Sequence, residues 1–169
     1  MVETVEQHRM GRNSIGSRVD LRVTGVPLGL GEPWFDGLEP ALARAMMSIP
    51  AARGVVFGRG FDVVQMTGIE HNDAWGGSSE RPELIGDNPD GVIAGLATGS
   101  PIHVSIAFKP PSSIATEQHT LNLASGILEP LVVGGRHDPV LGPRAVAVVE
   151  AMAQLVLADL ALRGGFIDA

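Results

Sequence analysis

Hydrophobic and polar residues alternate cleanly in two stretches of the chain. Val19, Leu21 and Val23 alternate with polar residues, and residues 102–108 carry an apolar side chain at every second position. Because successive side chains of a strand point to opposite faces, this period of two predicts two half-buried β-strands. Shorter apolar stretches predict four further strands, at residues 55–57, 61–66, 120–124 and 128–133.

Apolar residues recur at helical spacing from Leu38 to Ile49, and Pro50 ends that pattern. Asp36 followed by Glu39 resembles a capping box, with Asp in place of the usual Ser or Thr. These signals predict an amphipathic helix with one face on the core.

A second helix is predicted from Pro143 to about Arg163, where two glycines follow. It is apolar almost all round, so we expect both of its faces to be covered. Its polar residues, Glu150, Gln154 and Asp159, favour a buried helix over a membrane span.

The remaining stretches are richer in polar residues, glycine and proline. Residues 1–17 read as the tail of a helix followed by a turn, and residues 91–99 as a short packed helix or turn. Residues 67–90 predict a long loop, which in a compact domain is often functional. Alternating strands and a buried helix together predict an α+β layered fold, formed by residues 1–169 as a single domain.

Composition excludes several classes of function. The net charge of −7 and the absence of Tyr argue against nucleic-acid binding. No Cys is present, which excludes a disulfide framework and a thiolate nucleophile and is compatible with a cytoplasmic location. The polar, acidic start of the chain does not resemble a signal peptide, and we expect neither a membrane nor a nucleic-acid partner.

Two loops carry groups suited to anions. One is the Lys-Pro-Pro-Ser-Ser segment 109–113 after the strand 102–108, where a cation, two hydroxyls and backbone N–H groups can hold a phosphate. The other is Gly-Gly-Arg-His-Asp-Pro, residues 134–139, where Arg136 offers a bidentate fork. Each is also compatible with a plain solvated turn, and the scattered histidines show no spacing typical of a metal site.

Asp159 lies near the C-terminal end of the second helix, where the helix dipole disfavours a negative charge. Unless it simply points to solvent, such an acid needs a partner or a chemical role.

A series of short motifs resembles the chorismate synthase family, in the same order and at similar spacing along nearly the whole chain. Among them are Gly-Leu-Gly-Glu-Pro, Met-Ser-Ile-Pro-Ala, Glu-His-Asn-Asp and Gly-Arg-His-Asp-Pro. The matching stretches are residues 13–16, 25–27, 29–33, 35–36, 45–51, 60–61, 70–73, 107–110, 112–114, 135–139, 143–146 and 156–159.

The resemblance implies a β-α-β sandwich that assembles as a homotetramer. The implied reaction is a 1,4-anti elimination of phosphate from 5-enolpyruvylshikimate 3-phosphate to give chorismate, in the shikimate pathway of aromatic amino acid biosynthesis. It requires reduced FMN, whose reduction in some members draws on NADP chemistry, and the enzymes are cytoplasmic. The matched part is the C-terminal half of the family's chain.

The resemblance also implies roles for particular residues. Asp159 matches an acid near the flavin ring that is proposed to act catalytically, and we expect it to face the same pocket as Lys109. Ala94 falls where the family often has a glycine beside the flavin. The other matches are flavin contacts, namely Pro50, Ala51, Lys109, Pro110, Pro111, Ser112, Ser113 and Arg136.

Several positions depart from the family pattern. Asn13 replaces the usual Asp, Pro111 removes a hydroxyl, and residues 87–91 differ from the family's Asn-x-Ala-Gly-Gly turn. No His matches either catalytic histidine of the family, so we expect these 169 residues to be inactive on their own. The alternative hypothesis is an inactive remnant that binds FMN or other anions, or only oligomerises.

Overall fold

A three-stranded antiparallel sheet forms the centre of the computed structural model, which describes residues 1–86 and 90–168. The central strand is β7 (Ile102–Phe108), flanked by β1 (Ser17–Val23) and β2 (Ala52–Phe57). Val19 lies opposite Ile106 in β7, and the β2 register shifts between Ala52 and Gly54. The strands predicted from the period of two are therefore confirmed.

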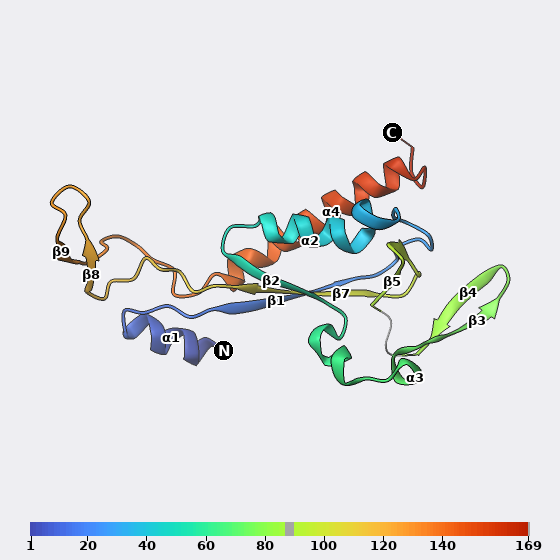
Figure 1. The fold of residues 1–169 in the computed structure, drawn as a ribbon, viewed down its shortest axis with the longest axis horizontal. Helices are drawn as coiled ribbons and strands as arrows, with labels where there is room; N and C mark the ends of the chain where they lie inside the picture. The colour runs from blue at the N-terminus through green and yellow to red at the C-terminus, as the bar shows by residue number, and fades with distance from the viewer. Residues whose placement is uncertain (87–89, 169) are drawn as a thin grey trace.

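Helices α2 (Leu38–Ser48) and α4 (Gly142–Arg163) cover one face of this sheet (Figure 1). Helix α2 packs on β2 and on α4, while α4 also packs on β1. The chain thus supplies a sheet and a helical layer, which confirms the α+β prediction.

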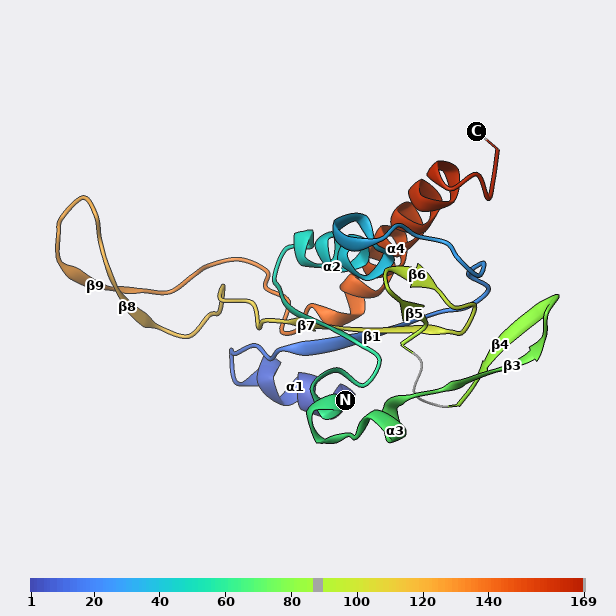
Figure 2. The same cartoon turned by 45° about the vertical axis from the view of Figure 1, so that its right-hand side comes forward.

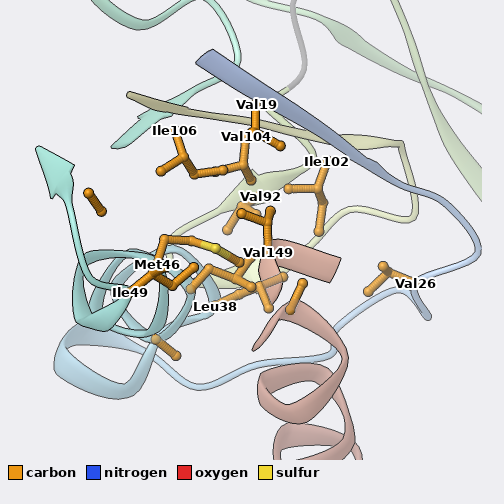
Figure 3. Close-up of a cluster of buried hydrophobic side chains, with 14 of the residues drawn as sticks. Val19, Val26, Leu38, Met46, Ile49, Val92, Ile102, Val104, Ile106 and Val149 are labelled. Carbon is orange, nitrogen blue, oxygen red and sulfur yellow. The ribbon is translucent and has the colours of Figure 1, made fainter. Parts of the chain in front are cut away.

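The core lies between the sheet and the two helices (Figure 3). Alternate residues of β7 point into it because one face of the strand is buried and the other is not. Leu38, Leu42 and Met46, spaced about one helical turn apart on α2, are fully buried against that face. The largest fully buried side chains are Leu30, Leu38, Leu42, Met46, Ile102, Ile106, Leu160, Val104 and Val149.

Helix α4 is covered on one face only within the described residues, so the expectation of two covered faces is wrong for this chain. Ala145, Val149 and Ala153 are buried, whereas Val146 and Leu155 are exposed. Length and hydropathy alone would let α4 cross a membrane, but a core helix has the same composition.

Several of the remaining elements project from this core, whereas the small hairpin that contains Val92 and Ala97 is packed into it (Figure 2). Helix α1 (Val2–Met10) precedes β1 and confirms the predicted helical start, and a 3₁₀ turn η1 (Trp34–Asp36) precedes α2. Beyond the sheet lie η2 (Gly60–Gln65), α3 (Gly68–His71) and three hairpins. The hairpins are β3 (Ala74–Ser78) with β4 (Arg81–Ile85), β5 (Val92–Ile93) with β6 (Leu96–Ala97), and β8 (Gln118–Leu121) with β9 (Leu128–Leu131).

Local structure differs from the predictions mainly between residues 60 and 99. The stretch 61–66 is a 3₁₀ helix rather than a strand, and the predicted loop 67–90 contains α3 and a hairpin. Residues 91–99, predicted as a short helix or turn, form the β5–β6 hairpin with its turn at residues 94–95. Strands β8 and β9 start and end within a few residues of the predicted ranges. These segments are too short for periodicity to separate helix from strand.

The expected capping box at α2 is absent. Gly37 occupies the N-cap position without a side-chain hydrogen bond. Asp36 belongs to the preceding 3₁₀ turn, and its carboxylate lies 3.8 Å from both Arg44 and Arg163. The 3₁₀ turn shifts the helix start by one residue, and this shift removes Asp36 from the position where it would cap.

Candidate anion-binding site

Lys109 leaves the sheet at the end of β7 and is held beside the turn that follows α2. Its backbone N–H donates to the carbonyl of Ala51 over 3.0 Å, so the segments predicted to share a site are in contact here. Ala51 has a left-handed backbone, with φ of 70°. A non-glycine residue in this region is strained, and such residues concentrate at functional sites.

The loop 110–113 and the loop 134–139 are brought together by the segment between α1 and β1. The Ser14 hydroxyl donates to the carbonyl of Pro111 over 2.5 Å, and the Ile15 N–H donates to the carbonyl of Pro139 over 2.8 Å. Ser113 and Gly135 therefore line one cavity of about 170 Å³. Both candidate loops lie at the same end of the molecule.

The cationic side chains of this region are available to a ligand. Lys109 and Arg136 are exposed, and neither makes a salt bridge or a side-chain hydrogen bond within the part of the chain that the structure describes. Asp138, the carboxylate at this cavity, lies 2.9 Å from the guanidinium of Arg144. The local charge is thus positive although the chain as a whole is acidic.

Asp159 does not point toward this region, so that expectation is wrong. Its side chain is 65% exposed and pairs with Arg163 at 3.1 Å. Arg144, near the start of α4, lines a cavity with Pro50 and Phe108. With a rise of about 1.5 Å per residue, Asp159 lies roughly 22 Å further along the helix than Arg144.

Ala94 also lies far from Lys109. It occupies the turn of the β5–β6 hairpin, and that hairpin packs beside Ile102, the opposite end of β7 from Lys109. Six residue steps along a strand separate the two ends by roughly 20 Å. The predicted residues therefore fall into two groups, with Ala94 and Asp159 apart from the rest.

Ala94 and Gly95 form the two-residue turn of that hairpin, with φ of 53° and 89°. Such turns require positive φ at both positions, which glycine adopts without strain. We predict that Ala94→Gly raises the free energy of unfolding by about 0.5–1 kcal/mol, because relief of the left-handed strain exceeds the entropy lost with glycine.

The measurement is urea unfolding, with Ala151→Gly on the exposed side of α4 as the control. Glycine in a helix interior should lower stability by about 0.5–1 kcal/mol. A destabilised Ala94→Gly variant would show that the alanine side chain makes contacts that outweigh the strain.

A second cavity, of about 310 Å³, is acidic and lies at the Ala94 end of the molecule. His71 and Asp90 line it, with His71 Nε2 4.0 Å from an Asp90 carboxylate oxygen. Burial, and then the charge of Asp90, raise the pKa of nearby Glu39. This acidic cavity does not suit an anion. Residues 87–89, part of the turn that departs from the family pattern, lie outside the described residues.

Arg12 is a residue of this site that the sequence pattern did not indicate. It lines the cavity of Ser113 and Gly135, and it stands in a left-handed conformation with φ of 54°. No family motif contains it, and an isolated arginine in a polar stretch gives no periodic signal.

The site and the fold together define an α+β sandwich protein with a cationic loop cluster at one end of its sheet. A profile of the chorismate synthase family matches residues 1–162. The chain therefore belongs to the chorismate synthase family.

Curated relatives and a solved structure agree with this assignment. A chorismate synthase of Dehalococcoides mccartyi is 42% identical over 167 residues, covering 99% of this chain and 46% of the relative. One of Roseiflexus castenholzii is 46% identical over 166 residues, with coverage of 96% and 46%. A crystal structure of chorismate synthase superposes with a TM-score of 0.76 at 28% identity, covering 96% of this chain and 42% of that one. The chain thus spans about half the length of the relatives it matches.

Proposed function

We propose that this chain is the C-terminal half of a chorismate synthase. In that assignment it takes part in the 1,4-anti elimination of phosphate from 5-enolpyruvylshikimate 3-phosphate, a step of aromatic amino acid biosynthesis. Family membership supports the reaction class, and the relatives' names support the product. A single domain over residues 1–169, a cytoplasmic location and a homotetramer of the full-length enzyme belong to the same proposal.

Two contacts carry the proposal. The backbone of Lys109 is hydrogen-bonded to Ala51, and Ser113 lines the same cavity as Gly135. These contacts gather exposed donors at one end of an acidic protein. The donors fit the phosphate of FMN, because a lysine point charge and two serine hydroxyls suit a tetrahedral anion with several acceptor oxygens.

Within this assignment, Lys109, Ser112 and Ser113 would hold reduced FMN, which would supply electron density to the substrate as the phosphate leaves. The chain's own residues bind and orient. Lys109, Ser112 and Ser113 hold an anionic group, and Pro110 with Pro111 restricts the loop so that little order is lost on binding. Arg136 adds a second cation at the same end of the molecule. Asp159 is carried over only as a match to the family's acid, since within this chain it lies apart.

Lys109→Ala should weaken FMN binding by roughly 10- to 100-fold, since a hydrogen bond to a charged group is worth about 1.5–3 kcal/mol. The loss should shrink as salt is added, because exposed charges are screened. Flavin fluorescence quenching during titration measures the affinity.

Arg81→Ala is the matched control, because Arg81 is an exposed cation on the β3–β4 hairpin, away from Lys109. It should leave FMN affinity unchanged. Equal losses in the two variants would indicate a general charge effect, and an unchanged Lys109→Ala variant would contradict the proposed site.

A further inference from the structure

Arg12 lies in the turn that leads from α1 to β1. Its N–H donates to the carbonyl of Arg9 over 3.1 Å, and its own carbonyl accepts a hydrogen bond from the Thr116 hydroxyl over 2.8 Å. These bonds fix the backbone on both sides of the residue. The left-handed φ of 54° is therefore built into the turn.

The residue in this strained position is the arginine and not the glycine beside it. Gly11, which caps α1, has an ordinary φ of −76°. Glycine adopts a left-handed backbone without strain. In this sequence the glycine is residue 11, whereas the left-handed position is residue 12, which is an arginine. Strained residues persist where the surrounding structure holds them, and they cluster at active sites and ligand-binding sites.

Arg12 lines the cavity of about 170 Å³ together with Asn13 and Ser113. Across residues 1–86 and 90–168, its guanidinium makes no salt bridge and no hydrogen bond. Arg9, the other arginine at this cavity, is already paired with Glu6. Arg12 is therefore the arginine at this cavity whose charge no carboxylate neutralises.

Residues with hydrogen-bond donors of three kinds line the cavity. Arg12 contributes a planar fork of N–H groups, Asn13 an amide, and Ser113 an exposed hydroxyl. The Asp138 carboxylate at the rim is neutralised by Arg144. A dense set of donors without a free negative charge suits an anion with several oxygens.

We propose that Arg12 binds a phosphate monoester group in this cavity, and that this role accounts for its strained backbone. The inference rests on the proposed function only in expecting the phosphate to come from the cofactor or from the substrate. Arg12 forms a bidentate contact with two phosphate oxygens, and Ser113 donates to a third.

The test separates binding from backbone strain by replacing Arg12 in two ways. Arg12→Gly removes the guanidinium and relieves the strain, so the Tm should rise by about 2–4 °C while affinity for inorganic phosphate falls about 10-fold or more. Arg12→Lys keeps a positive charge and the strained backbone, so its Tm should stay unchanged. Its affinity for inorganic phosphate should lie between that of the unmodified protein and that of Arg12→Gly. Calorimetric titration and thermal unfolding supply the two readouts.

Arg59→Gly is the matched control, because Arg59 is an exposed arginine with an ordinary φ of −77°. Its phosphate affinity should not change, and its Tm should not rise. A parallel fall of Tm and affinity in Arg12→Gly would indicate a structural role and overturn the inference. Phosphate affinity within twofold of the unmodified protein would overturn it as well.

Three ligands identify the source of the phosphate. If Arg12→Gly weakens FMN but not riboflavin, the group is the phosphate of the cofactor; if it weakens only 5-enolpyruvylshikimate 3-phosphate, the group belongs to the substrate. If Arg12→Gly binds these ligands normally while Lys109→Ala loses affinity for FMN, this inference is refuted and the proposed function stands. If Arg12→Gly loses affinity while Lys109→Ala binds FMN normally, the Arg12 site stands and the proposed FMN site at Lys109 is refuted.

Discussion

Residues 1–169 alone should give no sustained conversion of 5-enolpyruvylshikimate 3-phosphate to chorismate, even with reduced FMN under anaerobic conditions. The departing phosphate needs positioned cations and a proton donor. General acid help is worth roughly 10²–10⁴ in rate, and none of the histidines here matches the family's catalytic pair.

The structure also places one histidine, His137, at the candidate site. Among the described residues, His137 is the histidine that lines the cavity beside Ser113. Its Nε2 lies 3.1 Å from the carbonyl of Val133, so that nitrogen is already hydrogen-bonded. Of the two ring nitrogens of His137, Nδ1 is the one left to exchange a proton with a bound phosphate.

The measurement follows chorismate absorbance in an anaerobic assay. The Dehalococcoides mccartyi chorismate synthase, about half of which this chain matches, is the positive control. Steady multiple turnover by residues 1–169 would contradict the prediction and show that they form a sufficient catalyst. Tight FMN binding without turnover would instead favour the hypothesis of a flavin-binding remnant.

The second large effect concerns the core. Leu42→Ala should lower the free energy of unfolding by about 3 kcal/mol, because the substitution removes buried apolar atoms and leaves a cavity. Leu42 is 0% exposed and lies on the face of α2 that packs on the sheet. A loss of this size should lower the Tm by about 6–12 °C for a chain of this length.

Leu155→Ala on α4 is the matched control, because Leu155 is 66% exposed. Surface substitutions usually change stability by less than about 0.5 kcal/mol. If Leu155→Ala costs as much as Leu42→Ala, and the cost grows with protein concentration, the open face of α4 is buried by self-association in solution.

The amino-acid sequence is enough to predict the elements in which burial follows a regular period. The alternation in residues 102–108 located β7, and the long apolar run located α4, because in each the hydrophobic pattern repeats over enough residues. The same pattern placed Lys109 at a strand end, where a loop must begin. The family motifs then indicated that the loop after this strand and Arg136 are flavin contacts.

Which of these residues come into contact depends on the tertiary fold. Lys109 and Ala51 are far apart in sequence, and antiparallel pairing of β2 with β7 brings them within hydrogen-bond distance. Ala94 lies in the β5–β6 hairpin, which leads into the opposite end of β7 from Lys109, and the direction of α4 places Asp159 away from Lys109 as well. Sequence patterns report the burial of each residue but not the direction in which an element runs. The sequence pattern did not indicate Arg12 for the same reason. Arg12 is notable for its backbone angle and for its place at a cavity, and neither can be read from a pattern of burial.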